Sequence, residues 1–252
     1  MLKYLFPFLI LLIPLDASAY SLITKVADGH MVRIFHIPRN DVYRVKAVAS
    51  NTGTTLQALV KKGRGVAGIN AAYFLSGYNT GKPDRTNAVR IVDRIGFIYS
   101  RFYPDTGISG LFGFLSDNSP ILIQNNMYGP KELKENFNVR LLWGIESGIA
   151  NFPILLVSGI SYIFRYNELG LITDNMKKVR TNSFICRTEN GDVKMGTIEN
   201  ISMLDVPDFI IRFGCKDAIN LDSGKSLAMY DNRKYIVGPG QNIMDAFIIV
   251  RK

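Results

Sequence analysis

The stretch Arg180-Thr-Asn-Ser-Phe-Ile-Cys-Arg-Thr-Glu-Asn-Gly-Asp-Val-Lys-Met-Gly-Thr197 indicates most directly how this chain folds. Its dipeptide Asn190-Gly191 lies between two runs of strand-forming residues, 183–188 and 193–197. A type I′ turn needs positive φ at both central positions, and Asn-Gly is a dipeptide that adopts it readily. The stretch therefore predicts a β-hairpin with Asn190 and Gly191 at its tip.

Short runs of β-branched and aromatic residues recur along the whole chain, which is typical of strands. They occupy residues 31–37, 43–49, 66–74, 89–99, 121–123, 153–157, 184–187, 218–221, 235–237 and 246–250. Helical patterns are few: residues 54–62 begin with a threonine cap, residues 203–213 precede Gly214, and residues 131–136 form a third candidate. Many strands and two or three helices, without regular alternation, predict an α+β fold on a large, mostly antiparallel or mixed sheet.

Residues 1–19 have the features of a cleavable secretory signal peptide. Lys3 precedes an apolar run at 4–15, and the small residues Ala17-Ser18-Ala19 suggest cleavage before Tyr20. An uncleaved anchor would need about 20 apolar residues to cross a bilayer, and this run is shorter. No second apolar stretch of membrane length follows it. We therefore expect an exported protein, periplasmic or secreted, whose residues 20–252 form a single domain.

The charge balance indicates which partners the chain favours. It has 30 basic and 21 acidic residues, with a net charge of +9, and removal of residues 1–19 takes away one charge of each sign. Such a charge favours polyanions, including phosphate-bearing glycans, anionic lipid headgroups and nucleic acid. The basic residues are scattered in short pairs without interleaved aromatic side chains, so we expect no nucleic-acid partner.

Cysteine and histidine usage limits the chemistry further. Cys186 and Cys215 could form one disulfide in an oxidising compartment. Two buried free thiols would suit their apolar surroundings equally well. The only two histidines, His30 and His36, lie in contexts that favour structural roles, and the chain lacks the ligand set of a zinc site. We therefore expect neither a metal nor another cofactor.

Polar residues follow two of the predicted strands abruptly. Asn70-Ala-Ala-Tyr73-Phe74 ends one of them, and Asn220-Leu-Asp222-Ser-Gly-Lys-Ser226 continues another into a turn. A carboxylate at the end of a buried strand is partly desolvated and faces turn donors, conditions under which pKa values shift. Asp222 is thus the candidate catalytic carboxylate, although Asp-Ser-Gly is also a common turn sequence.

Four segments, taken in order, resemble the motifs of the phosphodiester glycosidase family. They are Asn70-Ala-Ala-Tyr-Phe74, Phe152-Pro-Ile-Leu-Leu-Val-Ser-Gly159, Arg180-Thr-Asn-Ser-Phe184 and Asn220-Leu-Asp-Ser-Gly-Lys-Ser226. The resemblance extends over residues 60–250. The chain departs from the family pattern where glycines are replaced, at Ala71, Ala72, Phe184, Ser223 and Lys225, and where Gln241-Asn242 stands near the place of an expected arginine.

The resemblance implies hydrolysis of the bond between a sugar's anomeric carbon and a phosphate in a phosphodiester-linked glycan. A phosphate leaves readily, so the demand on a strong general acid is low. Asp222 would be the catalytic carboxylate, Arg180 would bind the phosphate through its guanidinium fork, and Glu146 is the candidate second carboxylate. The candidate substrate-binding residues are Asn70, Tyr73, Asn220, Gly224, Lys225 and Ser226.

Two other functions remain compatible with the sequence. The replaced glycines could mark a catalytically silent relative that binds phosphoglycan or exopolysaccharide in the cell envelope. Alternatively, the positive charge could hold a structural envelope protein on anionic surface polymers, with a strong dependence on salt. Hydrolysis of a sugar-1-phosphate diester distinguishes the enzyme from both, and indifference to replacement of Asp222 would indicate the structural protein.

Overall fold

A computed structural model describes residues 19–40, 42–76, 83–86, 89–98, 109–124 and 144–252. Residues 1–18 of the expected signal peptide and the expected helix at 131–136 lie outside these ranges. Among the residues described, no helix is both long and apolar enough to cross a membrane.

The predicted hairpin forms the middle of the largest sheet, which has seven strands in the order β1-β2-β15-β14-β16-β12-β13. Its strands are β1 (Ser21–Ala27), β2 (His30–Ile37), β12 (Ile154–Val157), β13 (Ile160–Ser161), β14 (Arg180–Thr188), β15 (Val193–Ile201) and β16 (Cys215–Leu221). All neighbouring strands in this sheet are antiparallel. The order places the hairpin strand β14 directly beside β16, so the segments that carry Arg180 and Asp222 are neighbours.

The turn of this hairpin differs from the expected type I′ turn. Of the two residues predicted at its tip, only Gly191 has a positive φ, of 84°. The Gly191 N–H donates to the Thr188 carbonyl at 3.1 Å, and the Thr188 N–H donates to the Asp192 carbonyl at 2.9 Å. This pattern fits a three-residue loop that ends in a left-handed glycine. The Asp192 carboxylate also accepts from the Arg39 N–H and lies 3.0 Å from His36 Nε2, so tertiary contacts hold the longer loop.

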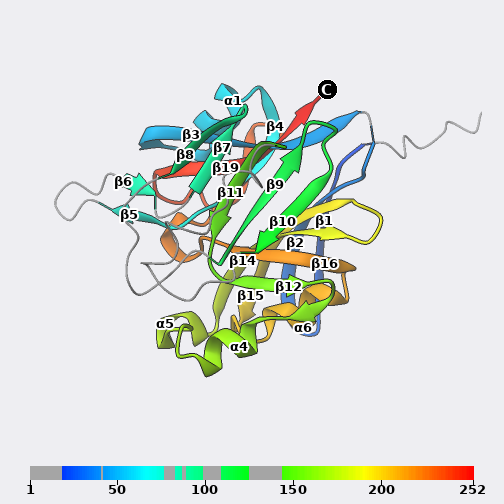
Figure 1. Ribbon diagram of the computed structural model, residues 1–252, viewed down its shortest axis with the longest axis vertical. Helices are drawn as coiled ribbons and strands as arrows, with labels where there is room; N and C mark the ends of the chain where they lie inside the picture. Colours follow the sequence, from blue (N-terminus) through cyan, green and yellow to red (C-terminus); the bar gives the residue numbers. More distant parts are fainter. Residues whose placement is uncertain (1–18, 41, 77–82, 87–88, 99–108, 125–143) are drawn as a thin grey trace, which may run out of the picture.

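Two five-stranded sheets and a two-stranded ribbon complete the described β-structure (Figure 1). The first, in the order β18-β17-β4-β19-β3, contains β3 (Tyr43–Thr54), β4 (Gly65–Asn70), β17 (Met229–Asp231), β18 (Lys234–Val237) and β19 (Ile243–Arg251). The second, in the order β10-β9-β11-β7-β8, contains β7 (Val89–Val92), β8 (Ile95–Ile98), β9 (Gly110–Leu115), β10 (Pro120–Gln124) and β11 (Ile145–Asn151). The ribbon pairs β5 (Phe74–Ser76) with β6 (Pro83–Thr86). The α+β, mostly antiparallel fold is confirmed, with its strands divided among several sheets.

Helix α1 (Leu56–Lys62) packs on the sheet formed by β3, β4 and β19. Thr55 caps it, because its hydroxyl accepts from the Ala58 N–H at 3.2 Å. Its apolar residues Leu56, Leu59 and Val60 are buried in a cluster with side chains of that sheet. This helix lies where the sequence predicts it.

The remaining helices lie together beside the seven-stranded sheet (Figure 1). They are α4 (Ile163–Glu168), α5 (Asp174–Lys177) and α6 (Val206–Ile211). Helix α6 is shorter than the predicted segment 203–213, because the Asp205 N–H donates to the Ser202 carbonyl and closes a turn before it. Pro207 occupies the first turn of α6, where its missing N–H costs no hydrogen bond.

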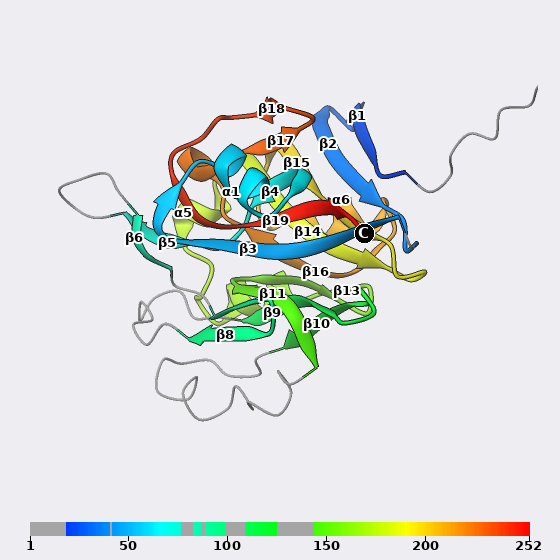
Figure 2. The same ribbon diagram turned by 90° about the horizontal axis from the view of Figure 1, so that it is seen from above.

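The main core contains side chains of the large sheet and of both five-stranded sheets, and Figure 2 shows the layer of β3 and β19 beside the layer of β9 and β11. Its aromatic centre consists of Phe112, Phe114 and Phe247, whose rings meet edge to face at centroid distances of 5.8 to 6.3 Å. Burial of each such side chain contributes about 1.5–3 kcal/mol. This packing fixes the strands from which the polar strand ends project.

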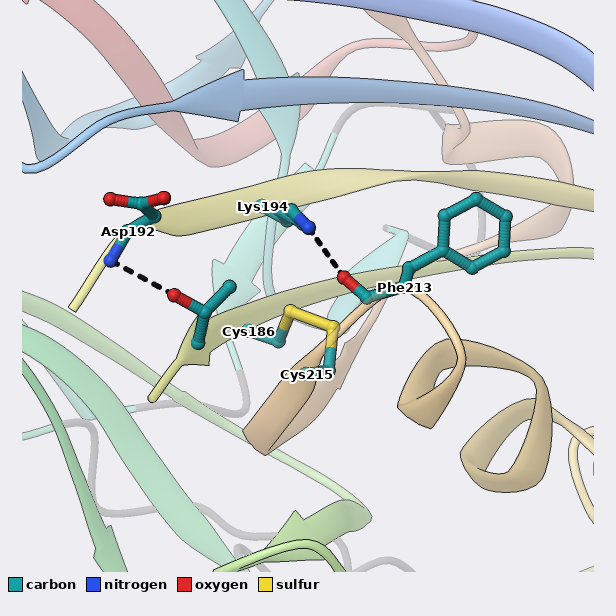
Figure 3. Close-up of a disulfide and its surroundings, with 6 residues drawn as sticks. Cys186, Asp192, Lys194, Phe213 and Cys215 are labelled. Atoms are coloured by element: carbon teal, nitrogen blue, oxygen red, sulfur yellow. Dashed lines mark hydrogen bonds between the residues drawn. A yellow bond between two sulfur atoms is a disulfide. The ribbon is translucent and has the colours of Figure 1, made fainter. Parts of the chain in front are cut away.

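The two cysteines form a disulfide between β14 and β16, with a Cα–Cα distance of 5.7 Å between Cys186 and Cys215 (Figure 3). Beside it, Lys194 Nζ donates to the Phe213 carbonyl, and the Asp192 N–H donates to Thr188 Oγ1 at 3.1 Å. The bridge lies at the start of β16, whereas Asp222 follows its end. It therefore ties the two strands together at the end remote from Asp222.

Candidate active site

The candidate site forms where β4 and β16 end. The predicted strand 66–74 stops at Asn70: the Ala71 N–H still donates to the Asp245 carbonyl of the neighbouring β19 at 3.3 Å, but the Ala71 carbonyl accepts from the Asp222 N–H at 2.6 Å. These bonds turn residues 71–73 away from the sheet and toward the end of β16. The break in the strand brings Tyr73 to Asn220, the residue two before Asp222.

Asp222 is the central carboxylate of the site, with only 9% of its surface exposed. Burial raises the pKa of its carboxyl to about 7, and the nearby charge of Asp245 acts in the same direction. Hydrogen bonds from the Ser226 side chain and the Ser223 N–H, together with the charge of Arg180, oppose this rise. Asp222 is thus able to gain or lose a proton near neutral pH.

Arg180, the first residue of β14, contributes the positive charge of the site. Its guanidinium lowers the pKa of both Asp222 and Tyr73, which places all three groups in one electrostatic neighbourhood. Arg180 Nε is buried and has no hydrogen-bond partner among the residues described. A buried donor without an acceptor is costly, so this guanidinium is suited to receive an anion.

Tyr73 and Asn220 form one wall of the site. Asn220 Nδ2 donates to the Tyr73 hydroxyl at 2.7 Å and to the Phe152 carbonyl at 3.2 Å. Burial and the charge of Asp222 raise the pKa of the Tyr73 hydroxyl above its ordinary value, so it stays protonated. Asn220 Oδ1 is buried without a hydrogen-bond partner in the described part of the chain, which leaves an acceptor for a hydroxyl group.

Two buried asparagines hold the backbone of the site. Asn70 Nδ2 donates to the Asp222 carbonyl at 2.7 Å, and Asn70 Oδ1 accepts from the Ala228 N–H at 3.0 Å. Asn151, at the end of β11, donates to the Asn220 carbonyl at 2.9 Å. Both polar groups of the Asn70 side chain are thus bonded to the backbone, so the structure uses it to position Asp222 rather than to face a ligand.

The loop after Asp222 divides between buried and exposed residues. Ser226 is buried, donates to Asp222 and accepts from Gln241 Nε2 at 3.0 Å. Gly224 and Lys225 are exposed at the rim. Within the loop only Gly224 has a positive φ, of 70°, whereas Ser223 has an extended backbone that any residue adopts. The glycine that the backbone requires is therefore present.

The structure separates Glu146 from the other expected site residues. Its carboxylate pairs with Arg44 at 3.2 Å near the start of β11, whereas Asn151 at the end of that strand lies in the site. Five residues of strand correspond to about 17 Å. The carboxylate near Asp222 is instead Asp245, whose Oδ1 accepts from the Ala72 N–H at 2.8 Å.

Sequence reasoning missed Asp245, Asn151 and Gln241, which all lie near the ends of strands. Asp245 directly precedes the predicted strand 246–250, so its position beside an apolar run was the available signal. Asn151 lies in a segment whose strand was not predicted. Among the residues described, no group of three His, Cys, Asp or Glu side chains could hold a metal ion.

The sequence model of the phosphodiester glycosidase family matches residues 63–250, and the chain belongs to this family. A search of curated protein sequences gives no match.

Solved structures show the same fold at low sequence identity. One is the catalytic domain of zebrafish N-acetylglucosamine-1-phosphodiester alpha-N-acetylglucosaminidase, auto-inhibited by its pro-peptide. Its sequence is 15% identical and its TM-score is 0.66, and the match covers 93% of this chain and 83% of that chain. A hypothetical protein from Synechocystis is 13% identical with a TM-score of 0.61, over 92% and 62% of the two chains. A putative exported protein from Burkholderia pseudomallei is 9% identical with a TM-score of 0.56, over 88% and 74%.

Proposed function

We propose that this protein is an active phosphodiester glycosidase, which hydrolyses the bond between a sugar's anomeric carbon and a phosphate in a phosphodiester-linked glycan. The observation that carries the proposal is the pairing of Asp222, whose carboxyl pKa is raised to about 7, with the positive charge of Arg180. The family to which the chain belongs supports the reaction class.

Arg180 suits the phosphate of such a substrate. A guanidinium offers donors in a planar fork that binds two phosphate oxygens, and it keeps its charge at every physiological pH. Its buried Nε lacks a protein acceptor among the described residues, so a phosphate oxygen supplies the missing bond. The same contact stabilises the negative charge that develops on the departing phosphate.

Asp222 acts as the base that activates water. In its ionised form the carboxylate accepts a proton from a water molecule, whose oxygen forms a bond to the anomeric carbon. The bond between that carbon and the phosphate oxygen breaks, and the phosphate leaves with the electron pair. A strong general acid is not required, because a phosphate is a good leaving group.

The sugar lies against Tyr73 and Asn220 in this proposal. The Tyr73 ring offers an apolar face for a sugar ring, and Asn220 Oδ1 accepts a hydrogen bond from a sugar hydroxyl. Gly224 and Lys225 at the rim leave room for the aglycone, and the exposed ammonium of Lys225 adds a second contact for phosphate. Asn70 and Ser226 position Asp222.

The backbone of the loop favours an active enzyme over a catalytically silent binder. Ser223 and Lys225 replace family glycines, yet neither has a positive φ. Ala71 and Ala72 also replace family glycines, and both are buried. The Asp222 N–H nevertheless bonds to the Ala71 carbonyl, so their methyl groups fit beside Asp222. The silent phosphoglycan binder, by contrast, would bind the glycan without releasing a product.

We further propose that the protein acts outside the cytoplasm, in the periplasm or after secretion. The amino-terminal sequence supports this location. One structurally similar protein is described as a putative exported protein. The disulfide between Cys186 and Cys215 suits an oxidising compartment.

The test is release of free sugar from a sugar-1-phosphate diester by the purified protein. We expect turnover by the wild type, a loss of at least about a hundredfold in kcat for Asp222→Asn, and a raised KM for Arg180→Gln. Asp93→Asn, in an exposed turn, is the matched control and retains full activity. Glycan binding without turnover by the wild type would favour the silent binder, above all if Lys225→Gly then gains activity.

A further inference from the structure

A cluster of positive side chains surrounds a surface cavity of about 310 Å³ away from the candidate site. The basic cluster consists of Arg44, Lys46, Lys62, Arg64 and Arg251. These residues come from the start of β3, the end of α1, the link between α1 and β4, and the end of β19. Figure 2 shows the C-terminus at the end of β19 beside β3, and the register pairs Arg251 with Tyr43.

The fold forces these cations together. Arg44 and Lys46 alternate with Val45 along β3, so both project from the same face of the strand. Residues Gly63 and Arg64 link α1 to β4, which pairs with the last residues of β19. Segments that are distant in the sequence thus place positive side chains around one cavity, where these like charges repel one another.

Little negative charge within the described structure offsets this cluster. Arg44 pairs with Glu146 at 3.2 Å, and Lys62 Nζ donates to the Ala49 carbonyl at 2.9 Å. No carboxylate in the described part of the chain forms an ion pair with the other three members. Arg44 Nε is buried and lacks a hydrogen-bond partner among the same residues. An anion in the cavity would satisfy this donor and relieve the repulsion.

We infer that the basic cluster is a second anion-binding site, which holds phosphate groups of a polyanionic glycan at a distance from the candidate active site. Guanidinium and ammonium groups around a concave surface suit compact phosphate oxygens. The site is separated from Asp245, near the catalytic carboxylate, by six residues of β19, or about 20 Å. A phosphoglycan with repeated phosphates could therefore occupy both sites at once, and its second contact would raise its affinity.

A glycan fits the cluster better than an anionic membrane. Peripheral membrane sites combine positive charge with exposed apolar side chains that enter the headgroup region. The exposed large hydrophobic residues described here are Val26, Ile95, Ile160, Phe164, Leu169, Val179 and Ile211, and none of them lines the cavity. The cluster therefore offers charge in a hollow, without an apolar anchor.

The binding test uses inorganic tripolyphosphate as the probe and calorimetry as the readout. We expect wild-type binding that weakens with salt, and a loss of about tenfold in the triple variant Lys46→Gln, Arg64→Gln, Arg251→Gln, because each of these cations contributes about twofold or more. The same tenfold loss should appear when the triple variant is made in an Arg180→Gln background, because that background removes the phosphate contact of the candidate active site and leaves the basic cluster intact. Absence of wild-type binding would overturn the inference.

A second triple variant controls for overall charge. Lys25→Gln, Arg233→Gln, Lys234→Gln removes the same three charges from exposed positions elsewhere, and we expect affinity within about twofold of wild type. An equal loss in both triple variants would mean that net charge alone attracts the probe, which refutes a defined site. The last measurement is binding to vesicles of phosphatidylglycerol and phosphatidylcholine. Binding to these vesicles without binding to tripolyphosphate would also refute the proposed site.

The identity of the polymer rests on the proposed function, whereas anion binding at the cluster does not. The triple variant at the cluster should hydrolyse a short sugar-1-phosphate diester normally and show a raised KM only for a phosphoglycan polymer. If the wild type hydrolyses neither substrate, the proposed function fails while the calorimetric result stands. If the polymer KM is unchanged in a variant that has lost tripolyphosphate binding, the link between the two sites is refuted.

Discussion

Replacement of Asp222 by asparagine should stabilise the folded protein at neutral and alkaline pH, even as it removes activity. Asparagine keeps nearly the shape of aspartate but carries no charge. The folded protein holds the Asp222 carboxyl in a buried position beside Asp245, where ionisation is costly. Catalytic groups often carry such a cost, and its removal then increases stability.

The magnitude follows from the shift in the Asp222 pKa, from 3.8 to about 7. A shift of about three pKa units corresponds to about 4 kcal/mol between the protonated and ionised forms. The pKa of Asp222 is higher in the folded state than in the unfolded state, so ionisation of this carboxyl destabilises the fold. The wild-type protein therefore keeps its full stability below pH 3.8 and loses this contribution as the pH rises through about 7. Above that pH the wild type is destabilised by the full free energy of ionising the buried Asp222 carboxyl, whereas Asp222→Asn has no carboxyl to ionise.

The assay is thermal unfolding of wild type and Asp222→Asn between pH 4 and pH 8. We expect nearly equal Tm values at pH 4 and a higher Tm for the variant at pH 8, by up to about 10 °C for a domain of this size. Asp93→Asn, in an exposed turn, should show no such pH-dependent difference. A Tm difference that stays constant with pH, or a less stable variant at pH 8, would refute the reasoning.

Three further predictions concern the same site and its support. The rate of diester hydrolysis should rise from pH 5 to pH 8 with a midpoint near 7, because the base must be ionised, and initial rates that fall over this range would contradict that role. Arg180→Lys should raise KM less than Arg180→Gln does, since an ammonium keeps the charge but loses the fork, and equal KM values would argue against phosphate binding there. The double variant Cys186→Ser, Cys215→Ser should lose about 3–4 kcal/mol of unfolding free energy, because the disulfide closes a loop with a sequence separation of 29. Unfolding in urea measures this loss, and an unchanged midpoint would show that the disulfide adds no stability.

Local patterns were sufficient for much of the fold. The hairpin of β14 and β15, the capped helix α1 and the closing strand β19 follow from residue types within short windows. Strands β1, β6, β9, β11, β13 and β17 were not predicted. Glycines at positions 110, 113 and 148 weaken the strand pattern of β9 and β11, yet they occur where neighbouring strands approach too closely for a side chain.

Arg180 and Tyr73 were predicted from their place in the family motifs, and other site residues because a polar residue follows an apolar run. Asp222 and Asn70 have this signal in the sequence. Glu146 has it as well, but lies at the wrong end of β11 and pairs with Arg44. A strand has two ends, and only its packing against other strands decides which end lies in the candidate active site.

The sequence by itself determined the class of fold, the position of the hairpin of β14 and β15 and the ordered motifs that mark the family, because turn chemistry and side-chain periodicity act over a few residues. Only the tertiary structure decided that Asp245 rather than Glu146 accompanies Asp222, and that Asn70 holds the backbone. It also decided that β14 and β16 are joined by the disulfide, a choice that the sequence left open. These outcomes depend on strand order and burial, which bring together residues far apart in the chain and set the pKa of the carboxylate between them.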